Sequence, residues 1–383
     1  MRITVVLGAF LPVPTIMGGA VEKVWLMLGQ EFARRGHQVV IVSRAVAQFP
    51  KEETIEGVRH VRVPGFDTPR SLPWLKVLDL IYSVRARAVL PQADIVVTNT
   101  FWLPMLLRDR SRGQMYVHVA RYPKGQMRFY RRAARLQAPS SAVARAIAKQ
   151  APVLSKRTKV IPYPAPSTVA ETAPPPVRER HRIILYVGRV HPEKGVHLLI
   201  DAFTAGARTV FAKWKLMIVG PTAEKFGGGG EPYLTSLKGL AQAAANQVTL
   251  AGPIFEPVEL ARTFRSARLF VYPSLAEHGE SFGLAPLEAM AHGCAVLVSD
   301  LECFQDFITD GGSGFVFNHR SMDASLVLRQ RMEQAIADET LLARTAEAGY
   351  RKSVEYSLPR VADQFLDDFK LVTPNSDAGN TSR

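Results

Sequence analysis

The sequence predicts an α/β protein made of two doubly wound domains, and three observations support this class. With 383 residues, the chain is long for one hydrophobic core, so two domains are the default expectation. Short apolar runs typical of buried strands alternate with segments of helical periodicity in both halves. The stretch 165–181, which contains three consecutive prolines, separates the halves and is predicted to be a linker.

The N-terminal half begins with a strand, a glycine turn, a helix and a second strand. Gly18 and Gly19 are expected to form the turn, where the missing side chains allow a close approach of backbone to a ligand, and Gly36 ends the helix. His118 lies near the end of the last apolar run of this half. The expected elements are strands at 3–7, 37–43, 58–63, 93–98 and 115–119, and helices at 20–35 and 74–90.

Six cations form the most basic segment of the chain. Their steps of three and four predict that they share one face of a helix, and no acidic residue occurs between Asp109 and Glu171. Such a face is either simply solvated or a contact for anionic lipid head groups or an anionic acceptor, which we favour. Nucleic acid is not expected as a partner, because no helix-turn-helix, RRM or zinc-finger pattern accompanies the charge. The six are Arg121, Lys124, Arg128, Arg131, Arg132 and Arg135.

The C-terminal half opens with a strand whose following loop carries two cations. Gly188 permits a tight strand-to-helix turn, and Arg189 and Lys194 are expected to project over the carboxyl edge of the sheet. The glycine run at 227–230 is predicted to be a flexible loop rather than a nucleotide cradle, since it lacks the Gly-Lys-Ser/Thr of a P-loop. The expected elements are strands at 183–187, 214–219, 248–252, 267–273 and 294–300, and helices at 196–204, 322–353 and 359–371.

A second loop of this half, after the strand at 267–273, has the composition of a ligand site. The backbone N–H groups of Gly283 and Leu284 are expected at a helix N-terminus, where such groups commonly hold a phosphate. Glu280 and Glu288 lie eight residues apart on either side of them. Carboxylates only accept hydrogen bonds, so beside a phosphate cradle they suit sugar hydroxyls.

The segment 280–300, ESFGLAPLEAMAHGCAVLVSD, closely resembles retaining GT-B glycosyltransferases of family 4, with the E-x7-E spacing of that group. The resemblance implies two Rossmann-like domains that face a central cleft: an acceptor domain at 1–164 and a nucleotide-sugar domain at 182–356. It also implies that a last helix, within 357–372, crosses back onto the N-terminal domain. The polar tail 373–383 is expected to be disordered.

This sequence departs from the family pattern in two places. Tyr163 and Pro164 stand where the family has Asn-Gly after an Ile-Pro pair, and Val119 follows His118 where the family has an acidic residue. The first departure concerns the hinge and the floor of the cleft, so the family's acceptor contacts there do not transfer. The second concerns the detailed role of His118.

The resemblance also implies roles for individual residues. Arg189 and Lys194 would bind the diphosphate of the donor, Glu280 the hydroxyls of its sugar and Glu288 those of its ribose. His118 would contact the donor sugar or the acceptor, so the implied catalytic set is Arg189, Lys194, Glu280 and His118. The implied donor-binding set is Gly18, Gly19, Arg189, Lys194, Pro253, Ile254, Glu280, Ser281, Phe282, Gly283, Leu284 and Glu288.

The expected function is transfer of a sugar from a UDP- or GDP-sugar to a hydroxyl of a saccharide or lipid-linked acceptor, with retention, in polysaccharide or glycolipid biosynthesis. No cofactor and no metal are expected, and no Asp-x-Asp occurs in the N-terminal half or beside Arg189. The alternatives are another GT-B activity, such as an epimerase or a phosphorylase, and a basic binding protein without catalysis. A phosphorylase would need a lysine motif for pyridoxal phosphate, which we do not find.

Charge and composition bear on the location of the protein. Residues 1–170 hold 26 Lys and Arg against 9 Asp and Glu, or +17, and the remainder holds 22 against 25, or −3, which together give the net charge of +14. The first eleven residues are predicted to be a strand rather than a signal peptide, and no run approaches the ~18 apolar residues of a spanning helix. Cys294 and Cys303 lack metal-ligand spacing and fit a reducing compartment. The expected location is the cytoplasm, either in solution or on the inner face of the membrane.

Overall fold

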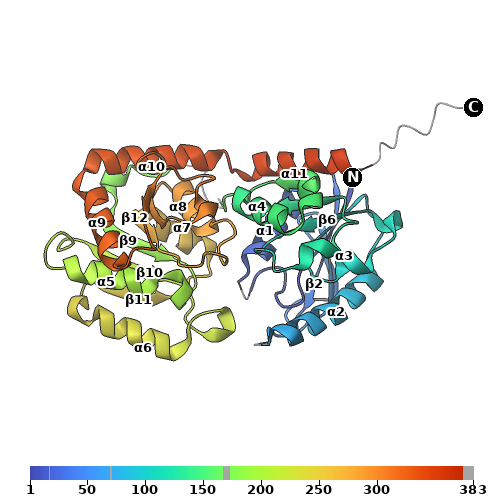
Figure 1. The fold of residues 1–383 in the computed structure, drawn as a ribbon, viewed down its shortest axis with the longest axis horizontal. Coiled ribbons are helices and arrows are strands. Elements are labelled where there is room, and N and C mark those ends of the chain that lie inside the picture. Colours follow the sequence, from blue (N-terminus) through green and yellow to red (C-terminus); the bar gives the residue numbers. More distant parts are fainter. Residues whose placement is uncertain (17, 70, 167–172, 374–383) are drawn as a thin grey trace, which may run out of the picture. The chain divides into compact units, whose positions relative to one another are not determined.

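A computed structural model describes residues 1–16, 18–69, 71–166 and 173–373 of the chain. The chain divides into two compact units (Figure 1). Unit 1 comprises Met1–Pro164 together with the C-terminal segment from Leu358, and unit 2 comprises Ala165–Ser357. Each unit is an α/β layer structure built on one sheet, and the two are described separately below.

Unit 1 is built on an eight-stranded sheet in the order β3-β4-β2-β1-β5-β6-β7-β8. All neighbouring strands run parallel except β3 and β4, which form an antiparallel pair at one edge. The strand order reverses direction beside β1, between β1 and β5, where an open α/β sheet usually binds its ligand. The strands are β1 (Arg2–Val6), β2 (Gln38–Ala45), β3 (Glu52–Ile55), β4 (Val58–Pro64), β5 (Ile95–Thr98), β6 (Gln114–His118), β7 (Arg135–Ala138) and β8 (Thr158–Val160).

The helices of unit 1 connect these strands and bury an apolar face against the sheet. α1 turns Val24, Trp25, Leu28 and Phe32 inward, at the spacing of one helical face. The helices are α1 (Ala20–Arg34), α2 (Leu72–Val89), α3 (Leu103–Leu106), α4 (Ser141–Gln150) and α11 (Leu358–Val372), with 3-10 turns at Arg110–Arg112, Gln126–Phe129 and Pro152–Arg157.

The last helix, α11, belongs to unit 1 although the whole of unit 2 precedes it in sequence (Figure 1). It buries Val361, Phe365 and Phe369, and the ring of Phe369 packs edge-on against Phe32 of α1 and Tyr116 of β6. The return of this helix to the N-terminal domain is therefore as predicted.

Asp368 ties α11 to the sheet through polar contacts. This buried carboxylate accepts a 2.8 Å hydrogen bond from the hydroxyl of Tyr116 and forms a 2.8 Å ion pair with Arg135 of β7. Because the partners come from two different strands, the carboxylate fixes the helix relative to the sheet.

Unit 2 is built on a fully parallel six-stranded sheet in the order β11-β10-β9-β12-β13-β14. In chain order this is 3-2-1-4-5-6, the doubly wound arrangement, whose switch point lies between its first and fourth strands. Those strands are β9 and β12. The strands are β9 (His181–Val187), β10 (Lys215–Val219), β11 (Val248–Gly252), β12 (Ala267–Tyr272), β13 (Ala295–Ser299) and β14 (Phe315–Phe317).

The helices of unit 2 agree with the predicted ones in type, with one correction. The single helix expected at 322–353 is two helices, broken at Asp338, whose side chain accepts a 2.9 Å hydrogen bond from Leu341 N and so starts the second helix. The helices are α5 (Val196–Gly206), α6 (Gly230–Ala241), α7 (Pro257–Ser266), α8 (Leu284–Ala291), α9 (Ala324–Ala337) and α10 (Glu339–Val354), with 3-10 turns at Val177–Glu179, Pro192–Lys194, Glu224–Phe226, Gln242–Ala244 and Glu302–Phe304.

The predicted linker, 165–181, is only partly an independent connection. Residues 167–172 lie outside the described residues, but Arg180 is buried in unit 2, where its guanidinium donates to Pro175 O and Ala267 O. Of the predicted disordered tail, Thr373 still bonds Phe369 O at 3.1 Å, and 374–383 lie outside the described residues. Among the helices that the structure describes, none combines the length and apolar character needed to cross a bilayer.

Candidate active site in unit 2

The centre of the candidate site is a buried ion pair between Lys194 and Glu280. Lys194 ends the 3-10 turn that follows β9, and Glu280 lies in the loop that follows β12. The ammonium Nζ donates directly to Glu280 Oε1, and both residues are buried. The pair therefore lies at the carboxyl ends of β9 and β12, over the switch point of the sheet.

Two neutral donors complete the surroundings of Glu280. The hydroxyl of Tyr272, the last residue of β12, donates to Oε1 at 2.9 Å, and Ser274 Oγ donates to the same atom at 3.2 Å. Burial, with the nearby Glu280 charge, raises the pKa of Tyr272 well above its usual value, so the hydroxyl keeps its proton. The carboxylate thus has one charged and two neutral donors, which offset the free-energy cost of removing it from water.

Arg189 lies at the same edge, linked to Lys194 by a carboxylate between them. Arg189 Nη2 donates to Glu193 Oε1 at 2.8 Å, and the same oxygen lies 3.8 Å from Lys194 Nζ. Arg189 Nη1 also donates to Gly227 O at 3.0 Å, and about half of its side chain stays exposed. The structure therefore brings together the two predicted cations and Glu280.

Gly195 explains why the two loops come so close. It has a left-handed φ of 68°, and a Cβ at this position would lie 2.0 Å from Pro273 O in the loop after β12. A hydrogen bond of 2.8 Å from Leu275 N to Glu193 O also joins the two loops. A side chain at position 195 would push the loops apart and separate Lys194 from Glu280.

The N-terminus of α8 lies next along the chain from Glu280. Gly283 precedes the helix with φ 101°, and a Cβ there would meet the Phe304 ring at 2.4 Å. Phe282 is buried against Phe307 and Tyr356, which anchors the loop. The first amide groups of α8, beginning with Leu284, have no acceptor within the helix because of their position, so they are available to an anion.

The other predicted donor-binding residues of unit 2 lie on neighbouring segments. Ser281 is partly exposed between Glu280 and Phe282, and Glu288 lies inside α8, one turn from its start. Pro253 and Ile254 follow β11, where Gly252 O accepts a 2.8 Å hydrogen bond from Gly220 N after β10. Their contacts with a nucleotide stay a prediction.

The predicted residues of unit 1 gather at the carboxyl edge of its own sheet. Gly19 precedes α1 with φ 115°, and a Cβ there would lie 2.4 Å from Glu22 Oε2. Gly18, also left-handed, comes just before it. The glycine turn thus leaves room for the carboxylate of Glu22, which is itself buried.

His118 is buried at the end of β6 with both ring nitrogens engaged. Nδ1 bonds Gln137 Oε1, and Nε2 lies 3.1 Å from the hydroxyl of Tyr163. Trp25 packs edge-on against the ring at 5.5 Å, and burial lowers the pKa of His118 to about 4. The imidazole is therefore neutral, and this geometry favours a packing role, while its predicted contact with donor or acceptor stays a prediction.

The prediction that the six cations share one helical face is wrong. The segment forms irregular turns and one short 3-10 turn, Gln126–Phe129, and Arg135 begins β7, where it pairs with Asp368. Pro123 and Gly125, which disfavour a helix interior, interrupt the segment, and the strand pairing of Arg135 overrides the helical spacing. The other five, Arg121, Lys124, Arg128, Arg131 and Arg132, are exposed.

Sequence reasoning missed four residues of these sites. Glu193, Tyr272 and Ser274 surround the Lys194–Glu280 pair, and Glu22 fills the glycine turn of unit 1. A signal existed for each: Glu193 adjoins Lys194, Tyr272 and Ser274 flank the end of a strand, and Glu22 follows the two glycines by three residues.

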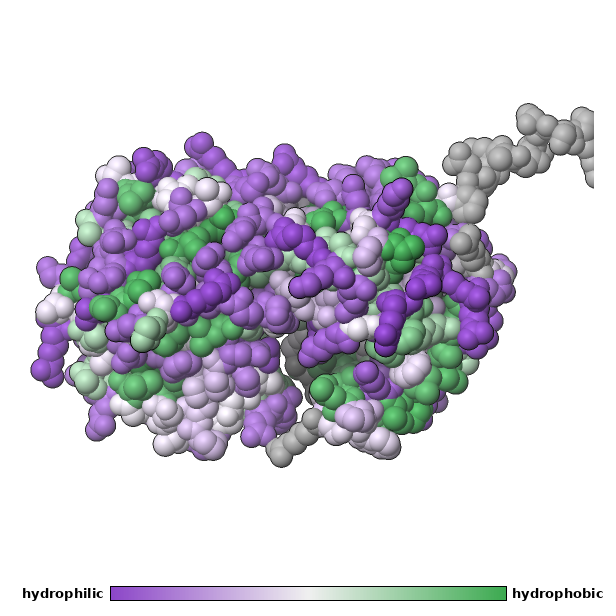
Figure 2. All heavy atoms as spheres, viewed as in Figure 1, coloured by the Kyte–Doolittle hydropathy of each residue, from purple (hydrophilic) through white to green (hydrophobic). Residues whose placement is uncertain are grey.

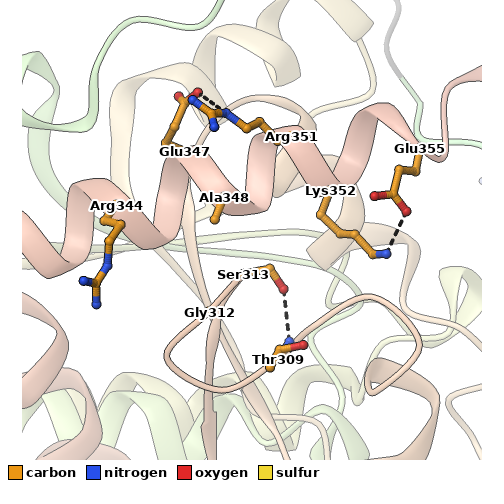
Figure 3. A pocket seen from close by; sticks show the side chains of 9 residues that line it. All are labelled: Thr309, Gly312, Ser313, Arg344, Glu347, Ala348, Arg351, Lys352 and Glu355. Carbon is orange, nitrogen blue, oxygen red and sulfur yellow. Dashed lines mark hydrogen bonds and ion pairs between the residues drawn. The ribbon is translucent and has the colours of Figure 1, made fainter.

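A groove on another face of unit 2 has a volume of about 580 Å³. Arg344, Arg351 and Lys352 of α10 line it together with the loop around Gly312 (Figure 3). Arg351 pairs with Glu347 and Lys352 with Glu355, and none of the predicted donor-binding residues lines it. Within the described residues, no group of three His, Cys, Asp or Glu side chains is placed to hold a metal ion.

Fold and site together define a GT-B protein with two Rossmann-like halves. Residues 17–165 match the model of Glycosyltransferase Family 4, and residues 170–352 match that of Glycosyl transferases group 1. The chain belongs to this family of group 1, family 4 glycosyltransferases.

Individual relatives are similar to parts of this chain. The lipopolysaccharide 1,2-N-acetylglucosaminetransferase of Salmonella typhimurium is 30% identical over 195 residues, 51% of this chain and 49% of that protein. The phosphatidyl-myo-inositol mannosyltransferase of Mycobacterium leprae is 28% identical over 192 residues, 50% of this chain and 47% of that protein. This chain therefore spans about half the length of these curated relatives.

Several solved structures resemble the fold of this chain over nearly its whole length. Sucrose-phosphate synthase from Thermosynechococcus elongatus superposes with a TM-score of 0.78 at 19% identity, covering 97% of this chain and 99% of that one. The Anabaena protein HepE, in complex with UDP and glucose, gives 0.71 at 16% identity, covering 96% and 99%. At such identities the likeness concerns the fold alone.

Proposed function

We propose that this protein is a retaining glycosyltransferase that moves a sugar from a UDP- or GDP-sugar to a hydroxyl of a saccharide or lipid-linked acceptor. The observation that carries the proposal is the Lys194–Glu280 pair over the switch point of unit 2, with Arg189 beside it. The family membership and the named activities of the two relatives support an acceptor from polysaccharide or glycolipid biosynthesis.

Breaking the bond between the sugar and the diphosphate leaves negative charge on the phosphate oxygens. Arg189, Lys194 and the amides of Gly283 and Leu284 are the groups that stabilise this charge, and one fixed donor of this kind is typically worth about 3–4 kcal/mol. A diphosphate competes with Glu280 for the ammonium of Lys194. Tyr272 and Ser274 keep Glu280 hydrogen-bonded while that exchange takes place.

The two carboxylates hold the rest of the donor in this proposal. Glu280 binds hydroxyls of the sugar, Glu288 binds those of the ribose, and the backbone near Pro253 and Ile254 contacts the base. From unit 1, the Gly18–Gly19 turn and His118 contribute contacts with the donor sugar or the acceptor.

The reaction forms a bond from the acceptor oxygen to the anomeric carbon on the face that the leaving group departs from. The carbon–oxygen bond to the diphosphate breaks, and the acceptor proton passes to the leaving phosphate oxygen. Because Arg189 and Lys194 supply the positive charge at the diphosphate, we propose that the transfer needs neither a metal ion nor a cofactor.

The exposed cations of unit 1 suit an acceptor that carries negative charge. Arg121, Lys124, Arg128, Arg131 and Arg132 are all exposed, and unit 1 contains most of the chain's excess positive charge. We assign them to an anionic acceptor or to lipid head groups rather than to nucleic acid, and place the protein in the cytoplasm, in solution or on the inner face of the membrane.

The test compares Arg189→Ala with Arg351→Ala. Both arginines form an exposed ion pair with a glutamate four residues away, so both variants should fold equally well. We expect Arg189→Ala to lower release of nucleotide diphosphate from UDP- or GDP-sugars about 100-fold, the effect of removing one fixed donor. Arg351→Ala should behave as the parent.

Equal turnover in the two variants would reject the diphosphate role of Arg189. A melting shift with UDP or GDP but no sugar release would support the alternative of a binding protein, and NMR of the product's anomeric proton separates retention from inversion.

A further inference from the structure

Helix α2 of unit 1 packs one face against the unit and leaves apolar side chains exposed on another face. Its buried residues are Leu78, Asp79, Tyr82, Ser83 and Ala86, whereas Trp74, Val77 and Val84 are exposed. Asp79 accepts hydrogen bonds from the backbone amides of Phe101 and Trp102, at 3.0 and 3.2 Å, so the polar face is held by the protein interior. The exposed apolar side chains of α2 do not belong to the hydrophobic core of unit 1.

The exposed apolar residues of α2 form one stripe. At 100° per residue, the steps of three, four and three from Trp74 to Val84 fall within an arc of about 80°. Ala88 lies on the same arc, and the stripe therefore runs along most of a helix of 18 residues. Figure 2 shows apolar side chains gathered over α2, at the lower right of the view. The members are Trp74, Val77, Ile81, Val84 and Ala88.

Cations border this stripe on both sides. Lys76 and Arg87 lie on one side, and Arg85 on the other. Aromatic rings hold two of them in place: Lys76 Nζ lies 5.0 Å from the Phe101 ring centroid, and the Arg85 guanidinium 5.1 Å from that of Phe66. The single acidic residue of α2, all of which the structure describes, is the buried Asp79.

We propose that this face of α2 docks on an anionic lipid surface. An apolar stripe with an aromatic residue and flanking cations is the pattern of helices that lie in the plane of a membrane, where apolar side chains enter the acyl boundary and cations contact the head groups. A second copy of the chain fits less well, because two α2 stripes packed together would align cations with cations and no exposed acid would compensate them.

This surface differs from the basic turns at 121–132, which carry charge with one exposed aromatic residue, Phe129. The difference allows a matched test. Trp74→Ser/Val84→Ser removes an aromatic and a valine from the stripe, which are 54% and 53% exposed. Phe255→Ser/Val153→Ser removes an aromatic residue and a valine outside both α2 and the basic turns, at 58% and 67% exposure.

The measurement is co-sedimentation of the full chain with vesicles of phosphatidylcholine and phosphatidylglycerol in equal parts, beside vesicles of phosphatidylcholine alone. We expect the parent to bind the anionic vesicles, the α2 pair to bind at least about tenfold more weakly, and the Phe255/Val153 pair to bind as the parent. Vesicle binding is measured without donor, so its outcome does not depend on the proposed activity.

A second readout uses the tryptophan of the stripe. Vesicles should shift the parent's fluorescence to the blue, and Trp74→Phe should keep binding while losing most of that shift. The proposal is overturned by unchanged binding in the α2 pair, by loss of binding in the Phe255/Val153 pair instead, or by no vesicle binding at all. It is overturned equally by a dimer in gel filtration that the α2 pair dissociates.

Discussion

The hydroxyl of Tyr272 donates a hydrogen bond of 2.9 Å to Glu280 Oε1 inside unit 2. This contact joins the last residue of β12 to a carboxylate that Lys194 also binds. This oxygen therefore accepts hydrogen bonds from two segments of the chain, so a substitution in either segment should alter the contacts of the other with Glu280.

Tyr272→Phe should lower the free energy of unfolding by about 1–2 kcal/mol, because it removes one donor from a buried carboxylate. It should also weaken binding of a nucleotide sugar, since Glu280 then relies more strongly on Lys194. Urea unfolding and titration calorimetry measure the two effects. Tyr350→Phe is the control, because the Tyr350 hydroxyl makes no hydrogen bond within the described residues. An equal loss of stability in both variants would show that the Tyr272 hydrogen bond to Glu280 does not contribute specifically.

Lys194→Met should destabilise the fold by about 3 kcal/mol, because it leaves the Glu280 charge buried without its cation. Adding Glu280→Gln should restore part of the lost stability, since the remaining carboxamide is neutral. Sugar transfer should be lost in both variants. Strictly additive destabilisation in urea unfolding of the single and double variants would contradict the coupling.

Stability should fall as the pH rises through the titration of Glu22. Burial raises the pKa of Glu22 from 4.5 to about 7, opposed by a backbone hydrogen bond and by Arg121. The folded state then holds a proton that the unfolded state releases. The stabilisation is therefore complete below about pH 4.5 and is lost as the pH rises through about 7, by at most ~3 kcal/mol.

Other buried groups titrate in the same range, among them His118, whose lowered pKa acts in the opposite direction, so the contribution of Glu22 is the difference between the parent and Glu22→Gln when unfolding is followed between pH 4.5 and pH 8. Glu56→Gln, at an exposed position of the same unit, should keep the pH dependence of the parent. The same pH dependence in the parent and in Glu22→Gln would show that Glu22 is ionised in the folded protein.

Gly283→Ala should be more destabilising than Gly311→Ala. Both glycines have a positive φ, 101° and 69°, which costs an alanine about 1 kcal/mol. A Cβ at position 283 would also meet the Phe304 ring at 2.4 Å, whereas nothing lies within 4 Å of one at position 311. Thermal unfolding of the two variants should differ by several degrees. Equal melting temperatures would mean that the ring moves aside without cost.

The sequence predicted the elements that have a strong local pattern. The strands β1, β2, β4, β5 and β6 of unit 1 and β9 to β13 of unit 2 lie where expected, as do the glycine turn before α1 and the E-x7-E loop, because the apolar periodicity and the placement of glycines are clear there. The short strands β3, β7, β8 and β14 were not predicted. The order of the strands, which places Lys194 beside Glu280, depends on pairings between distant segments and cannot be seen in local periodicity.

The predictions that were wrong also have physical explanations. The spacing of cations from Arg121 to Arg135 indicated a helix, but Arg135 pairs in β7 and is neutralised by Asp368, which lies 233 positions later in the chain. The helix expected at 322–353 is broken because Asp338 caps a new helix more favourably than it continues the old one. The exposed apolar stripe of α2 could not be predicted, because apolar residues at helical spacing occur on both its buried and its exposed faces.

The attachment of α11 to unit 1 has a consequence for the order in which the protein can be assembled. The ribosome makes residues 358–372 only after all of unit 2, so the surface formed by Phe32 and Tyr116 stays uncovered while unit 2 is synthesised. Unit 2 can complete its own sheet while the nascent chain is still attached, whereas unit 1 must wait for α11. A truncated product that stops before residue 358 would therefore leave the earlier unit incomplete and exposed to aggregation, although it retains every strand of both sheets.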